Sequence, residues 1–156
     1  MDDLCHRSMR SRLQAALACA ALALAGAGCA NMMEGTKAAA SQPSAPTLSG
    51  ANEVPAVTTA ATGRSMIVVH PNRAVSGSVS TTGLNNATMA HIHVGAPGAN
   101  GPVIVPLVRG DGGSWTVPAG AMLTEDQFAS WRAGNLYVNV HSAAFPGGEI
   151  RAQLRP

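Results

Sequence analysis

The chain has 156 residues, a formal net charge of +2, and 46% hydrophobic but only 3% aromatic residues. Its length suits one ordinary domain rather than two large ones. Charged residues make up 12% of the chain, about half the usual share for a soluble domain. No basic stripe is present, which argues against a nucleic-acid-binding protein. The 17 glycines and 10 prolines disfavour helical bundles and coiled coils.

The first 28 residues are typical of a bacterial export signal. Arg7, Arg10 and Arg12 give a positive start, and residues 13–28 are uncharged and rich in Ala and Leu. An uncharged stretch of this length is short for a membrane span and suits the apolar region of a signal peptide. The coding start is either Met1 or Met9, since the residues after Met9 form a cleaner basic start.

The signal segment ends in a motif that resembles a lipoprotein box. Small residues precede Cys29, which we expect to be lipidated and to become the new N-terminus. Gly26 departs from the usual pattern, where a Leu-like residue is common, and simple secretion is the alternative. Ala30 after the cysteine resembles outer-membrane sorting. We therefore expect a protein of the bacterial cell envelope, anchored by lipid in the outer membrane and facing the periplasm or the cell surface. The expected partner is the membrane, reached through this anchor.

Residues 29–46 are rich in small and polar residues and predict a flexible, lipid-anchored linker. All three cysteines, Cys5, Cys19 and Cys29, come before the domain that follows. The domain therefore has no disulfide framework and no thiolate ligand. A metal site within it has to use histidine, carboxylate or methionine.

Residues 47–156 predict an all-β domain, an antiparallel Greek-key-like β-sandwich with one short helix. Short β-branched runs alternate with Gly, Pro and Asn, as in sandwiches and barrels. The expected strands cover residues 47–51, 64–70, 74–81, 88–94, 103–108, 114–117, 136–141 and 149–154.

The helix is predicted at about residues 125–133. Thr124 and Gln127 have the spacing of a capping box, and Gly134 stands where a glycine ends a helix. We expect Phe128 and Trp131 on this helix to pack into the core rather than to contact a ligand.

Three histidines are predicted to lie on the polar faces of their strands. Alternation over residues 88–94 puts His91 and His93 together on the polar face, and His141 has the same facing in residues 136–141. Two imidazoles two residues apart on a strand can chelate one metal ion. A third from a neighbouring strand completes a site suited to copper or zinc. The alternative is three histidines that are satisfied by neighbouring polar side chains.

Three further residues are weaker candidates for this site. Met89 shares the face of His91, and its thioether favours copper. Glu149 flanks a loop opposite His141 and can orient that imidazole, bind metal, or pair with an arginine. His70 precedes a Pro-Asn turn and is a candidate fourth ligand. No catalytic triad and no phosphate loop is recognisable in the sequence, so a non-enzymatic protein is the favoured expectation.

Three separated motifs resemble the CHRD (chordin) domain family. They are 48-LSGANEVP-55, 90-AHIHVG-95 with 101-GPV-103, and 134-GNLYVNVH-141 with 146-PGGEIR-151. The resemblance covers about residues 47–154 and departs from the family at Ala152, where Gly is usual. It implies a β-sandwich module, with no general catalytic activity for bacterial members.

A weaker, local resemblance is to the copper-binding strands of copper/zinc superoxide dismutase. It rests on His91-Ile-His93 and on the later Val-His141. That enzyme needs more histidines, an aspartate in its zinc loop and a cysteine pair, whereas this domain has four histidines and no disulfide. Our leading hypothesis is an exported, non-enzymatic CHRD lipoprotein with a copper site, or less favoured a zinc site, at these three histidines. The alternatives are a metal-free structural or protein-interaction module and a copper-only, dismutase-like redox enzyme.

Overall fold

A computed structural model describes residues 45–156, which fall within one compact unit of the chain. The predicted signal peptide, Cys29 and nearly all of the predicted linker lie outside these residues and stay predictions. Within the described part, no helix is long and apolar enough to cross a membrane.

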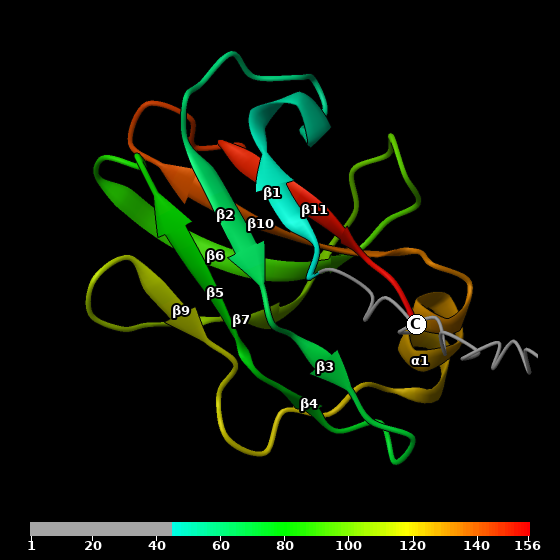
Figure 1. Ribbon diagram of the computed structural model, residues 1–156. Helices are drawn as coiled ribbons and strands as arrows, with labels where there is room; N and C mark the ends of the chain where they lie inside the picture. The colour runs from blue at the N-terminus through cyan, green and yellow to red at the C-terminus, as the bar shows by residue number, and fades with distance from the viewer. Residues whose placement is uncertain (1–44) are drawn as a thin grey trace, which may run out of the picture. The chain divides into compact units, whose positions relative to one another are not determined.

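The regular structure of the described residues is mostly β with one short helix, as expected from the sequence (Figure 1). In chain order the elements are β1 (Thr47–Ser49), the 3₁₀ helix η1 (Gly50–Asn52), β2 (Thr62–Ser65), β3 (Val68–Val69), β4 (Val75–Ser76), β5 (Ser78–Thr82), β6 (Ala87–Val94), β7 (Val103–Pro106), β8 (Val108–Arg109), β9 (Ser114–Thr116), α1 (Glu125–Arg132), β10 (Leu136–Ser142) and β11 (Ile150–Leu154).

Nine strands form one antiparallel sheet in the order β7-β6-β10-β11-β1-β2-β5-β9-β8, and β3 pairs with β4 in a separate hairpin. The two edge strands, β7 and β8, follow each other in the chain with only Leu107 between them. The N–H of Leu107 donates to the carbonyl of Ala90 in β6 over 2.9 Å. One extended segment thus borders both edges, and the sheet nearly closes into a barrel. The single strand expected over residues 103–108 is accordingly two strands.

Two more expected strands are broken where the chain leaves the large sheet. Residues 64–70 divide into β2 and β3, and residues 74–81 divide into β4 and β5 at Gly77. Gly77 has a φ of 104°, and a Cβ at this position would lie 2.1 Å from the Met66 carbonyl oxygen. Glycine is required there because of both the backbone conformation and the close approach. The first strand also ends two residues earlier than expected, since η1 begins at Gly50.

The predicted helix forms, and it ends one residue earlier than expected. The Thr124 hydroxyl accepts from the Gln127 N–H over 3.2 Å, and the Gln127 side chain accepts from the Thr124 N–H over 2.9 Å. This is the capping box that the sequence predicts. Gly134 has a φ of 75°, as expected for the residue that ends a helix. Phe128 and Trp131 pack against the core and stay partly exposed.

The hydrophobic core lies inside the curved sheet. Its fully buried side chains include Leu48, Val79, Ile92, Val138 and Ile150. All core residues lie between residues 48 and 154, so this part of the chain has a core of its own.

The opposite, polar face of the central strand β10 is covered too. All seven residues of β10 are buried. The cover includes the loop that follows β6, in which the Gly101 N–H donates to the Tyr137 hydroxyl of β10 over 3.2 Å. The polar side chains of this face therefore lie in the interior of the domain rather than on its surface.

Candidate metal centre

The three predicted histidines converge, as the alternation of β6 and β10 indicates. These strands are antiparallel neighbours, with His93 opposite Tyr137 and His91 opposite Asn139. One ring nitrogen from each of His91, His93 and His141 lies within 4.8 Å of the other two. Metal–imidazole bonds of about 2.0–2.1 Å fit nitrogens at such separations after small side-chain shifts.

His141 is held by the loop between β10 and β11. Its Nδ1 lies 2.9 Å from the carbonyl oxygen of Pro146. Because a carbonyl only accepts, Nδ1 carries the proton and Nε2 has the free lone pair. That Nε2 lies 3.2 Å from Nδ1 of His91. A backbone acceptor on the distal nitrogen is the arrangement that orients metal-binding histidines.

His93 is oriented in the same way by the loop before β7. Its Nδ1 lies 2.9 Å from the Gly101 carbonyl oxygen, so Nδ1 donates and Nε2 is the nitrogen left for a metal. Its ring stacks on Tyr137, with centroids 4.6 Å apart and planes 5° apart. Its Nε2 lies 2.9 Å from the side chain of Asn139. His93 and His141 are each only 6% exposed.

Two of the three histidines are kept neutral by their surroundings. Burial lowers the pKa of His91, and the neighbouring rings of His141 and His93 lower it further. Burial also lowers the pKa of His93, although hydrogen bonds to Gly101 and Asn139 partly offset this effect. Neutral imidazoles have the lone pair that a metal ion needs, so the lowered pKa values favour the ligand form of these two rings.

The weaker candidates lie in three different places. Met89 is opposite His141 in the strand register and is 45% exposed. The buried Glu149 carboxylate accepts from the Thr59 hydroxyl over 2.7 Å and is not among the converging ligand atoms. His70 lies outside the cluster as well, with its Nε2 2.8 Å from the Ser76 hydroxyl.

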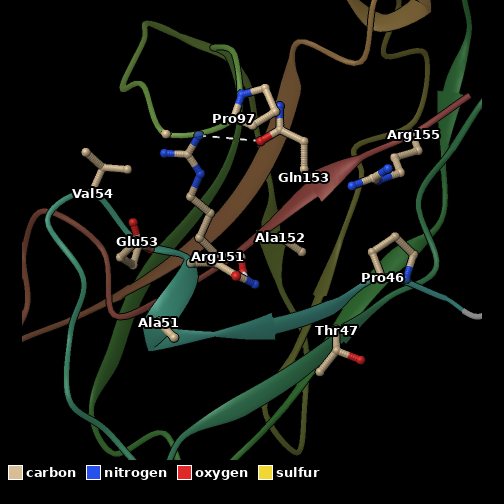
Figure 2. Close-up of a pocket in the computed structure, with 12 residues that line it drawn as sticks. Pro46, Thr47, Ala51, Glu53, Val54, Pro97, Arg151, Ala152, Gln153 and Arg155 are labelled. Atoms are coloured by element: carbon tan, nitrogen blue, oxygen red, sulfur yellow. Dashed lines mark hydrogen bonds between the residues drawn. The ribbon is translucent and has the colours of Figure 1, made fainter.

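Two buried ionisable residues near the site were not singled out from the sequence, Glu53 and Arg151. Figure 2 shows both in the wall of one cleft, with Arg151 extended toward the loop that follows β6. The Arg151 side chain is 1% exposed, lies 3.4 Å from the centre of the Tyr137 ring, and donates to the Ala99 carbonyl over 2.9 Å. Alternation places Arg151 on the histidine face, but no local pattern relates residue 53 to that face.

Glu53 is an acid in an unfavourable place for a negative charge. Burial raises its pKa to about 7, against the lowering effects of the Arg151 charge, the Asn139 amide and the Val54 N–H. Its Oε1 has no hydrogen-bond partner among the described residues, although it is fully buried. An orphaned buried carboxylate oxygen is costly, which favours the neutral acid.

The antiparallel sheet, which nearly closes into a barrel, defines this domain as a β-barrel-like sandwich module. A family model of the CHRD domain matches residues 45–154, so the chain belongs to the CHRD domain family. No curated protein and no solved structure matches the chain.

Proposed function

We propose that this domain binds one transition-metal ion, copper in preference to zinc, through His91, His93 and His141. The observation that carries the proposal is the convergence of three ring nitrogens within 4.8 Å. Two of these rings already have a backbone carbonyl on the distal nitrogen, which leaves the other nitrogen for a metal. The role is metal binding or handling without catalysis.

Copper is favoured over zinc by the available donors. Three imidazoles bind Cu(II) more tightly than Zn(II) in the general order of divalent metals. Met89 precedes His91 by two residues on the same strand face and lies opposite His141 in the strand register, which supports it as an additional ligand. A thioether suits copper, above all Cu(I), and adds little to a zinc site.

The proposed setting is the bacterial cell envelope. The lipoprotein-type motif at Cys29 and the linker over residues 29–46 support a domain tethered to the outer membrane, facing the periplasm or the cell surface.

Metal titration of residues 30–156 tests the proposal, because this part retains the core and omits all three cysteines, whose thiolates would bind copper. We expect one Cu(II) per chain, with Zn(II) bound more weakly. The His91→Ala/His93→Ala double variant should lose this binding. His70→Ala is the matched control, since His70 lies outside the cluster. Unchanged affinity in the double variant would overturn the proposal.

A second candidate function is a structural or interaction module without metal. It is favoured by one observation: both ring nitrogens of His93 and the Nδ1 of His141 already have polar neighbours at 2.9 Å. This candidate predicts no stoichiometric metal and a protein partner that is recovered by crosslinking.

The redox alternative is favoured by the partial exposure of His91, which leaves one side of the cluster accessible. Superoxide consumption by the copper-loaded domain tests it. Metal loading without turnover would exclude that alternative and leave the binding proposal in place.

A further inference from the structure

A line of polar side chains leads from the three-histidine site to the cleft that Glu53 lines. Nε2 of His93 lies 2.9 Å from the Asn139 carboxamide oxygen. The Asn139 amide nitrogen and the Glu53 Oε1 meet at Gly148, where a Cβ would lie 2.6 Å and 2.5 Å from them. Gly148 has a φ of 129° and no side chain, which leaves room for this meeting.

The position of the proton on His93 determines which way the Asn139 carboxamide must face. The Gly101 carbonyl accepts from His93 Nδ1, so a neutral His93 has a lone pair on Nε2. A lone pair next to the Asn139 carbonyl oxygen would place two acceptors face to face. Turning the carboxamide by a half-turn brings its N–H to Nε2 and costs little, since the two ends of an amide have nearly the same shape.

The half-turn has a consequence for Glu53. It brings the Asn139 oxygen to the Glu53 Oε1, and these two atoms make a hydrogen bond only when the carboxyl group carries a proton. A protonated Glu53 therefore gives a partner to the one carboxylate oxygen that lacks one. Each hydrogen bond in the line from Glu53 through Asn139 and His93 to Gly101 then pairs one donor with one acceptor.

We propose that Glu53 and Asn139 form a latch on the three-histidine site. In the metal-free state, the Glu53 carboxylic acid donates to the Asn139 oxygen, and the Asn139 N–H donates to His93 Nε2. A metal ion binds this nitrogen when the carboxamide turns back. The Asn139 N–H then donates to the Glu53 carboxylate, and the proton that Glu53 carried is released to water. Metal binding is thus coupled to the release of one proton. The inference rests on the proposed function and deepens it, because it names the groups that regulate the same site.

The surroundings of Glu53 support both states. Glu53 lines a cleft of about 470 Å³, which gives its proton a route to solvent (Figure 2). The buried Arg151 is the charged group that faces it and favours the carboxylate. Arg155 lines the same cleft, and the Glu149 carboxylate is engaged with Thr59. Burial sets the pKa of Glu53 at about 7, so a small change in its contacts decides whether the proton stays.

The first test counts protons released per metal ion at about pH 6, below the Glu53 pKa of about 7. Calorimetric titration of residues 30–156 with Cu(II) in buffers of different ionisation enthalpy gives this number. The wild type should release about one proton more than Glu53→Gln, because glutamine donates to Asn139 but has no proton to lose. Below that pKa, wild-type affinity should also rise up to about tenfold per pH unit more steeply than that of the variant. Glu125→Gln, an exposed helix residue, is the matched control and should behave as the wild type.

The second test needs no metal. Nitrogen NMR of the metal-free domain should show His93 as the neutral tautomer with the proton on Nδ1, and infrared spectra at about pH 6 should show a protonated carboxyl band that Glu53→Gln lacks. A proton on Nε2 would overturn the latch even if the variant fails to fold. Equal proton counts in wild type and Glu53→Gln would overturn the latch alone. A wild-type domain that binds no metal would overturn the proposed function and the latch together.

Discussion

The strands β6, β10 and β11 have two chemically opposite faces, and along β10 both of these faces are fully buried. One face presents aliphatic side chains such as Ile92, Val138 and Ile150 to the core. The other presents histidines, Asn139 and Arg151, the last only 1% exposed. On the aliphatic face, removal of water is itself the source of stability. On the polar face the same removal is costly unless every donor finds an acceptor.

The polar face is satisfied mainly by loops rather than by its own strands. The carbonyls of Gly101, Pro146 and Ala99 accept from His93, His141 and Arg151 in turn, each over 2.9 Å. These acceptors lie on the turns that flank the strands. We conclude that the aliphatic face stabilises the domain. The polar face reduces part of this stability because it holds buried polar groups in a defined arrangement.

The largest effect on the free energy of unfolding is expected from Arg151→Ala, because Arg151 is the most buried side chain of the polar face. The change leaves the Ala99 and Ala96 carbonyls and the Asn100 side chain without their donor. We expect a loss of about 3–5 kcal/mol in the free energy of unfolding, as for other buried charged groups that lose a partner network. Urea denaturation measures it. The exposed Arg155→Ala should change stability by less than about 0.5 kcal/mol.

A slightly smaller loss is expected from Ile92→Ala on the aliphatic face. Ile92 is 1% exposed, and truncation leaves a cavity that the rigid sheet fills poorly. A cost of about 3 kcal/mol is typical of such a change. Urea denaturation in the presence and absence of Cu(II) measures both stability and metal dependence. Loss of metal binding in a variant that is still folded would contradict the separation between the two faces.

Metal binding should act only through the polar face. With Cu(II) at about 100 times its dissociation constant, the wild type should gain about 2.7 kcal/mol in the free energy of unfolding. His141→Ala removes one converging nitrogen, so its gain should be much smaller. Thermal unfolding with and without the metal gives the comparison. An equal gain in both proteins would place the metal elsewhere.

The last expected effect is the pH dependence of the stability of the metal-free domain. The pKa of Glu53 is raised to about 7 in the folded state, from 4.5 for the free side chain. The folded state thus holds a proton that the unfolded state has lost, and the Glu53 contribution to stability decreases as the pH rises from about 4.5 to about 7. Above that range the loss is complete.

The variant Glu53→Gln isolates this contribution. Wild type and variant should differ more at about pH 8 than at about pH 5, with the variant relatively more stable at the higher pH. The lowered pKa values of His91 and His93 act in the opposite direction, because the unfolded state takes up protons below about pH 6.5. Both proteins share that histidine effect. A difference in stability that does not change with pH would contradict a raised pKa for Glu53.

The sequence predicts the fold class, the helix and the facing of the three histidines, because each is encoded locally. A capping box needs only Thr124 and Gln127, and alternation over a single strand assigns the faces of His91 and His93. The expectation that His141 joins them depends on β6 and β10 being neighbours, which the structure confirms.

Tertiary structure alone decides the closure of the sheet and the surroundings of the site. The sequence predicts one strand over residues 103–108, yet this segment is divided between the two edge strands β7 and β8, because the Leu107 N–H donates to β6 between them. The acid of Glu53 approaches Asn139 from a segment more than eighty residues earlier in the chain. Periodicity reports which side of a strand a residue occupies. It carries no information about which distant loop covers that side, because register and loop packing are set by the whole core.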